Sequence, residues 1–195
     1  KKIKLINSKK SYIERIGKNK IELLTKKDNN CFSNFQNIKE CDVIIICVPT
    51  SLKNNKPDLS NIRSSFSSIR KYLKKNQILI LESTSYPGTT EEEIVNKIKQ
   101  RFKIGENFYV GFSSERINPG VNENSLREIP KVTSGYTKNC SLLISKFYSM
   151  FFKKIVEAKS LKIAEFSKLL ENIYRAVNIS FYNEMKLVAD KMHLD

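Results

Sequence analysis

The feature that most constrains the fold is a short apolar segment that occurs three times along the chain. The three segments read CDVIIICVPT (41–50), QILILEST (77–84) and NFYVGFSS (107–114). Uninterrupted apolar runs of this length are typical of strands buried on both faces of a parallel sheet. Helical patterns separate them. The sequence therefore predicts an α/β fold with a parallel sheet and right-handed crossovers.

The helical patterns are clear in spacing and in charge. Between the first two segments, apolar residues recur every three or four positions: Leu59, Ile62, Phe66, Ile69 and Leu73. This spacing predicts an amphipathic helix. The stretch TTEEEIVNKIKQRF, after the second segment, predicts another helix, because its acidic first turn complements the helix dipole. The first residues, KKIKLINSKKSYIERI, also have a helical pattern, as of a helix already under way.

The second half of the chain predicts two more strands and one long helix. The strands are expected at 131–135 (KVTSG) and 153–158 (KKIVEA), with a helix at 139–151 between them. From about Lys159 the chain contains no further glycine or proline, which allows a single helix of about 50 Å. This helix is apolar around much of its circumference, so we expect it to be buried on several sides.

Composition limits the partners. The net charge of +15 would be compatible with nucleic-acid binding, but the lysines are spread along the whole chain and do not alternate with aromatic residues. We therefore expect a solvated basic surface and no nucleic-acid partner. The longest apolar run, VIIICV, is far shorter than the roughly 20 residues of a membrane helix, so no membrane association is expected.

The cysteines and the histidine do not form a metal-binding pattern. The four cysteines contain no CxxC pair, and His193 is the single histidine. We therefore expect no metal site. Free thiols in this number fit a reducing cytoplasm, which is the expected location. Cys47 lies within an apolar run and is expected to be a small core residue.

Polar side chains follow each of the three apolar segments. Thr50 ends the first, Glu82-Ser83-Thr84 ends the second, and Glu115 with Arg116 follows the third. In parallel α/β sheets, ligands bind beyond the carboxyl ends of the strands. Ordinary turn and capping chemistry is the alternative for each strand end taken singly. Three polar ends on one edge favour a binding site.

The long helix carries a fourth polar cluster. Lys168 and Asn172 lie four residues apart and Arg175 three further, so they share one face. With Glu165 and Glu171, these cations can instead form a surface ion-pair ladder of little energetic value. Apolar neighbours crowd Lys168, which favours an enclosed polar pocket. A strand-end carboxylate with a lysine and an asparagine suits an oxyanion and an activated water.

Four colinear motifs resemble the nucleotide-sugar 6-dehydrogenases, the UDP-glucose / UDP-N-acetylhexosamine dehydrogenase family. They are ESTSYPGTTEE, FYVGFSSERINPG, IPKVTSG and KIAEFSKLLENIYRAVNISFYNEM, and YIERI and CVPT are also similar. The resemblance covers essentially the whole chain. It implies a truncated Rossmann-like parallel sheet followed by a long central helix. Residues 1–158 would be part of the NAD-binding domain, without its first strand–helix unit, and 159–195 the start of a central helical domain that links domains and forms a homodimer.

The resemblance also implies an activity, a cofactor and site residues. Family members use two NAD+ to oxidise the C6 alcohol of a UDP-sugar to a carboxylate, through a thiohemiacetal and a thioester on a cysteine. The catalytic set is Thr84, Glu115, Lys168 and Asn172; the cofactor contacts are Val48, Pro49, Thr50 and Thr84; the substrate contacts are Glu115, Arg116, Ile117, Asn118, Lys168, Asn172 and Arg175. The motifs YPGTTEE and ERINPG favour an N-acetylated substrate over UDP-glucose, either UDP-N-acetylglucosamine or UDP-N-acetylmannosamine. The resemblance thus implies a role in bacterial surface-polysaccharide synthesis.

Three departures from the family pattern leave alternatives open. The Gly-rich loop with its ribose-binding acid, and the Gly-Gly-His-Cys nucleophile, are expected outside this chain, so the segment is expected to be an inactive fragment by itself. Ser114 stands where the family usually has proline. A non-catalytic remnant or binding module of the same fold is one alternative, and UDP-glucose 6-dehydrogenase is another. The 6-phosphogluconate and 3-hydroxyacid dehydrogenases rank lower because they lack ERINPG.

Overall fold

The apolar segments form neighbouring strands of one sheet. The computed structural model describes residues 2–13, 16–24, 31–54, 56–114 and 127–194, and two compact units, Lys1–Glu40 and Cys41–Asp195, divide the chain. In the second unit, five strands lie in the order β1-β4-β5-β6-β7. They are β1 (Val43–Ile46), β4 (Ile78–Leu81), β5 (Tyr109–Ser113), β6 (Lys131–Gly135) and β7 (Ile155–Glu157). The predicted α/β fold is confirmed.

The sheet is mostly parallel. Strands β1, β4 and β5 pair in parallel, with Ile78 opposite both Val43 and Tyr109. Strand β6 runs antiparallel to β5, and β7 runs parallel to β6. The sheet is thus mixed at the β6–β7 end, which the strand–helix alternation alone did not predict. As a result, the first residue of β6 lies at the edge of the sheet where β4 and β5 end.

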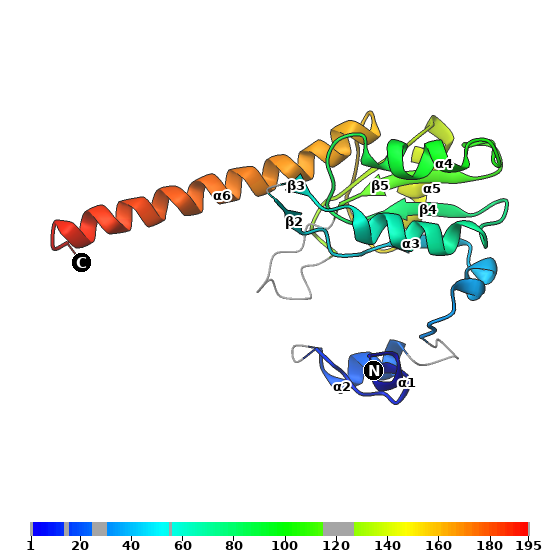
Figure 1. Ribbon diagram of the computed structural model, residues 1–195, viewed down its shortest axis with the longest axis horizontal. Coiled ribbons are helices and arrows are strands. Elements are labelled where there is room, and N and C mark those ends of the chain that lie inside the picture. The colour runs from blue at the N-terminus through cyan, green and yellow to red at the C-terminus, as the bar shows by residue number, and fades with distance from the viewer. Residues whose placement is uncertain (1, 14–15, 25–30, 55, 115–126, 195) are drawn as a thin grey trace. The chain divides into compact units, whose positions relative to one another are not determined.

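Helices cover both faces of this sheet (Figure 1). One face carries Ile44, Ile46, Leu79, Leu81, Val110 and Phe112, all at most 7% exposed. It packs against α3 (Ser60–Arg70) and against the π-helical turn η3 (Glu91–Val95), which continues into α4 (Asn96–Ile98). The five apolar residues that predicted the first helix are all buried, so this prediction is confirmed.

The other face packs against α5 (Lys138–Ser149). Its core contains Ile80 from the sheet and Cys140, Ile144 and Tyr148 from the helix. The Thr137 hydroxyl caps α5 by accepting a hydrogen bond from the Cys140 amide at 3.2 Å. Glycine at position 135 lets the helix start lie directly against β6, because a Cβ there would lie 2.1 Å from the Ser141 nitrogen.

Strand β1 is less buried than the sequence predicts. Its residues alternate between buried and accessible, and Ile45 is 40% exposed. Cys47 is exposed, so its assignment to the core is wrong. The reason is that β1 ends the strand order of the described sheet, and α5 packs mainly against β5, β6 and β7.

Helix α6 (Leu161–Lys191) is a single helix of 31 residues, as predicted. The Ser160 hydroxyl caps it, accepting a hydrogen bond from the Ile163 amide at 3.3 Å. The expected burial on several sides is wrong for this chain alone, because its buried residues are Leu161, Ala164 and Glu165. Large apolar side chains are exposed along the rest of it, among them Phe166, Leu170, Tyr174, Phe181 and Met185. No described helix is apolar enough over a sufficient length to cross a membrane.

The first unit, Lys1–Glu40, contains short helices: α1 (Lys2–Asn7), α2 (Lys18–Leu24) and η2 (Phe35–Glu40). The second unit also contains a small hairpin, in which β2 (Leu52–Lys53) pairs with β3 (Lys56–Pro57). The expectation of one continuous helix at the start is wrong, because α1 ends at Asn7. The Asn7 side chain instead bonds the Cys31 amide at 2.8 Å and the Cys31 carbonyl at 2.9 Å.

Candidate active site

The carboxyl ends of β1 and β4 are joined by hydrogen bonds. The amides of Glu82 and Ser83 donate to the Ile46 carbonyl at 3.0 and 3.2 Å. The Ser83 hydroxyl accepts from the Val48 amide at 2.8 Å. These bonds bring the segment with the predicted cofactor residues Val48, Pro49 and Thr50 beside the segment that leads to Thr84. The structure therefore places the four predicted cofactor residues on two adjacent strand ends.

The turn after β4 leads into a helical segment whose start is bound by a buried carboxylate. Gly88 has a φ of +104°, a backbone conformation that glycine adopts without strain. The Glu165 side chain of α6 is fully buried and accepts hydrogen bonds from the Gly88 amide at 2.5 Å and the Thr90 amide at 2.8 Å. The Thr90 hydroxyl adds a third bond at 2.7 Å. Glu165 thus fixes α6 to the turn that leads from β4 into η3.

Burial raises the pKa of the Glu165 carboxyl, and the hydrogen bonds from Thr90 and Gly88 oppose this effect. The folded protein therefore holds this proton more tightly than the unfolded chain does. A raised pKa in the folded state contributes stability that is present at low pH and is lost as the pH rises through the folded-state value. The relevant window begins near the ordinary glutamate pKa of 4.5 and extends upward.

We expect Glu165→Ala to lower the free energy of unfolding by about 2–3 kcal/mol, because two amides and a hydroxyl lose their buried acceptor. The difference between wild type and variant is expected to shrink as the pH rises from 4.5, through the loss of the proton-linked contribution. Denaturant titrations at several pH values measure both effects. Glu184→Ala, at an exposed position of α6, is the matched control. A pH-independent difference would contradict this account of Glu165.

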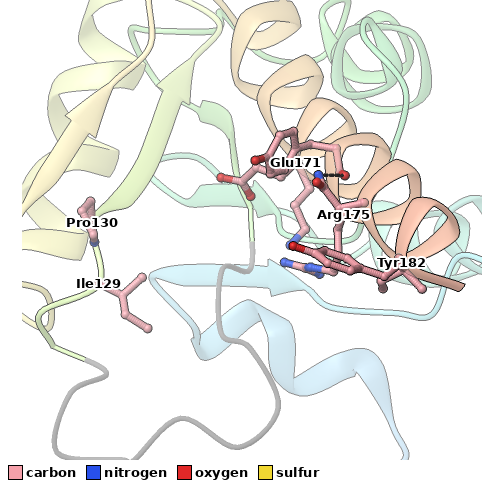
Figure 2. A pocket seen from close by; sticks show the side chains of 9 residues that line it. Ile129, Pro130, Glu171, Arg175 and Tyr182 are labelled. Atoms are coloured by element: carbon pink, nitrogen blue, oxygen red, sulfur yellow. Dashed lines mark hydrogen bonds between the residues drawn. The ribbon is translucent and has the colours of Figure 1, made fainter. Parts of the chain in front are cut away.

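A pocket of about 640 Å³ lies beside α6 (Figure 2). Ile129 and Pro130, just before β6, form one side of it. The other side comes from successive turns of the helix: Lys168, Glu171, Tyr174, Arg175, Asn178, Ile179 and Tyr182. The Asn178 amide group donates to the Tyr174 carbonyl at 2.7 Å. The pocket combines two cations, one carboxylate and two aromatic rings, which is a composition suited to a polar ligand with an anionic group.

Two of the predicted site residues on α6 line this pocket. Lys168 and Arg175 are among its residues, as their spacing predicts. Asn172 lies half-buried on the same helix and is not among the lining residues. Thr84, at the end of β4, is half-buried and also lies outside the lining. Glu115, Arg116, Ile117 and Asn118 lie outside the described residues, so their convergence with Lys168 remains a prediction.

Sequence reasoning missed a buried ion pair at the same edge of the sheet. The Lys131 ammonium lies 2.6 Å from a Glu82 carboxylate oxygen, and their side chains are 6% and 13% exposed. The Tyr148 hydroxyl donates to the same carboxylate at 2.5 Å. A signal was present in part, since a lysine at the start of a buried strand needs a buried partner. Among the described residues, no group of three or more His, Cys, Asp or Glu side chains can hold a metal ion.

Comparison with known proteins places this geometry in a family. The model of the NAD binding domain of the UDP-glucose/GDP-mannose dehydrogenase family matches residues 1–152, and the model of the central domain of the same family matches residues 162–195. The chain belongs to the UDP-glucose/GDP-mannose dehydrogenase family. Its Rossmann-type sheet thus comes from a domain that binds NAD, and its long helix matches the central domain.

The similar proteins are longer than this chain. This chain is 39% identical over 166 residues to a UDP-N-acetyl-D-glucosamine 6-dehydrogenase of Pseudomonas aeruginosa. The matched segment covers 83% of this chain and 39% of that protein. The corresponding protein of Salmonella typhi is 37% identical, over 84% of this chain and 39% of its own length. A solved UDP-D-ManNAc dehydrogenase of Pyrococcus horikoshii has a TM-score of 0.89 at 30% identity, over 97% of this chain and 46% of that one. The chain therefore spans about two fifths of the curated relatives it matches.

Proposed function

We propose that the protein containing this chain is an NAD-dependent 6-dehydrogenase of UDP-N-acetylglucosamine or UDP-N-acetylmannosamine, acting in surface-polysaccharide synthesis. The observation that carries the proposal is the placement of Lys168 and Arg175 in one pocket on α6, a helix that Glu165 anchors to the turn at Gly88 and Thr90. Relatives named for oxidation of both N-acetylated sugars support the substrate class. The two domains of this chain, 1–158 and 159–195, would each contribute part of the site.

The strand ends would hold the cofactor. Val48, Pro49, Thr50 and Thr84 lie on adjacent ends of parallel strands, where nucleotide cofactors bind in doubly wound sheets. Bound NAD+ would accept the hydride from the C6 carbon. The chain's own contribution there would be to orient the cofactor, with Thr84 between cofactor and substrate. Glu115 would assist the hydrolytic step through a water, and Arg116, Ile117 and Asn118 would lie along the sugar nucleotide.

Helix α6 would hold the reacting oxygen and the charged part of the substrate. Lys168 and Asn172 would stabilise negative charge that develops on this oxygen, because an ammonium and an amide group both donate hydrogen bonds. Arg175 would bind the sugar nucleotide in the same pocket. A volume of about 640 Å³ is within the range of small-molecule sites. The exposed apolar side chains of α6 would be covered in a homodimer.

The test is an assay of the complete gene product. We expect NAD+ reduction with UDP-N-acetylglucosamine or UDP-N-acetylmannosamine, and a slower reaction with UDP-glucose. Absorbance at the NADH band measures the rate, and two NADH per sugar distinguish formation of the acid from formation of the aldehyde. Without UDP-sugar, the same protein provides the control. If none of the three UDP-sugars supports NAD+ reduction, the proposed function is wrong.

One observation favours a second candidate, a non-catalytic binding module of the same fold. Ser114 occupies the position where the resemblance leads us to expect proline, and its buried hydroxyl has no hydrogen-bond partner among the residues that the structure describes. A buried hydroxyl without a hydrogen-bond partner costs free energy, so this departure from the family pattern is destabilising. This candidate is favoured if the complete protein binds NADH and UDP-sugar in calorimetry but does not turn them over.

A further inference from the structure

A buried three-residue cluster lies where β4, β5 and β6 meet at one edge of the sheet. Glu82 directly follows β4, Lys131 begins β6, and Tyr148 comes from α5. The strand register explains why they meet. Ile78 and Ile80 point to the α5 face, so Glu82 continues along that face, and the antiparallel direction of β6 brings Lys131 to the same edge.

The Lys131 ammonium contacts two strand ends at once. It lies 2.6 Å from Glu82 and 3.3 Å from the carbonyl oxygen of Ser114, the residue after β5. The rings of Tyr148 and Phe152 lie 4.8 and 5.4 Å from it, close enough for cation–π attraction. Lys131 is only 5% exposed, so these contacts form away from water, where each is stronger than at the surface.

Each contact of Lys131 adjoins a part of the proposed site. Glu82 precedes the cofactor residue Thr84 by two positions, and Ser114 directly precedes Glu115. Lys131 also directly follows Ile129 and Pro130, which precede β6 and form one side of the pocket beside α6.

We propose that Lys131 is a positioning residue of the dehydrogenase, which fixes the end of β5 and the start of β6 against the end of β4 and thereby sets the distance between the cofactor side of the site and the pocket wall formed by Ile129 and Pro130. Lys131 does not touch the reacting atoms in this proposal. Glu82 neutralises the buried ammonium, and Tyr148 donates to the carboxylate oxygen that also accepts from Lys131. The inference depends on the proposed function.

The experiment compares three variants in the complete protein, with NADH production as the readout. Lys131→Met keeps the apolar stem and removes the ammonium, and we expect kcat to fall roughly 10- to 100-fold with smaller changes in both KM values, as small misplacements in an active site do. Lys131→Arg retains a donor that reaches both oxygens and is expected to recover most of kcat. A residue with only a structural role would lower the folded fraction, not kcat per folded molecule.

The third variant, a double substitution, covers the case in which Lys131→Met does not fold. Lys131→Met with Glu82→Gln leaves no uncompensated buried charge, and it still lacks the bond to Ser114, so the loss of kcat is expected to persist. Lys153→Met is the matched control, because Lys153 forms an exposed ion pair with Glu128 near the same strand and its loss should leave kcat unchanged.

The outcomes separate this inference from the proposed function. If wild type turns over UDP-sugar and the folded double variant does so at the same kcat, Lys131 has no positioning role and the inference is wrong. Equal kcat losses in Lys131→Arg and Lys131→Met would also overturn it, since charge and donor would then not matter. If wild type itself reduces no NAD+ with any UDP-sugar, the proposed function fails, and the inference fails with it.

Discussion

Replacing Lys168 with alanine in the complete protein is expected to lower kcat by about 100-fold or more, because one buried donor to developing negative charge contributes about that factor. Lys168 lines the pocket beside α6, one turn along the helix from Glu165. An interaction made mainly in the transition state lowers kcat and kcat/KM together. Steady-state kinetics with NAD+ and the preferred UDP-sugar would measure both.

The matched control for Lys168→Ala is Lys186→Ala on the same helix. Lys186 pairs with Asp190 at 3.0 Å, and both side chains are more than half exposed. Its removal is expected to leave kcat within a factor of about two, because exposed ion pairs contribute little. Unchanged turnover in Lys168→Ala would identify Lys168 as a member of a surface ion-pair ladder.

The second large effect is expected for stability, in Gly135→Ala. A Cβ at this position would lie 2.1 Å from the Ser141 nitrogen and 2.5 Å from the Cys140 carbonyl carbon. Both atoms belong to the backbone of α5, so the helix must move away from β6. The Gly135 amide would then also lose its bond to the Ser141 hydroxyl, which is 2.8 Å long. We expect the free energy of unfolding to fall by about 3–5 kcal/mol.

Gly17→Ala is the comparison for this substitution. No atom lies within 4 Å of a Cβ at Gly17, so a change within about 0.5 kcal/mol is expected. Chemical denaturation followed by circular dichroism would measure both variants. If Gly135→Ala unfolds at the wild-type midpoint, the close contact between β6 and α5 is not required for the fold.

The sequence predicts the strands and the long helix well because their signals are local. The buried runs at β4 and β5, the spacing from Leu59 to Leu73, and the absence of glycine and proline after Lys159 each depend on neighbouring residues. Such patterns determine which segments form strands or helices. They are independent of what the rest of the molecule places nearby.

The errors arise where burial depends on distant parts of the molecule. Cys47 and Ile45 lie in an apolar run that matches a central strand, yet β1 ends the described sheet and one of its faces is accessible. The apolar circumference of α6 likewise predicts burial that this chain alone does not supply. In both cases the apolar pattern indicates that the segment is suited to burial. It does not show which other part of the molecule, if any, covers it.

The candidate site shows the same division. Lys168 and Arg175 share a pocket because helical spacing places them on one face, which the sequence contains. The pairing of Glu82 with Lys131 joins residues 49 positions apart. It depends on the reversed direction of β6, which strand patterns do not encode. A prediction of polar strand ends could therefore name Glu82 but not its partner.

The attachment of Glu165 to the turn at Gly88 and Thr90 has a mechanical consequence for the proposed enzyme. The helix that carries the Lys168 ammonium cannot tilt or slide without pulling on the backbone at Gly88 and Thr90, a few residues beyond Thr84. A movement of α6, on the proposed substrate side, would thus be coupled through the Glu165 carboxylate to the turn that follows Thr84, on the proposed cofactor side.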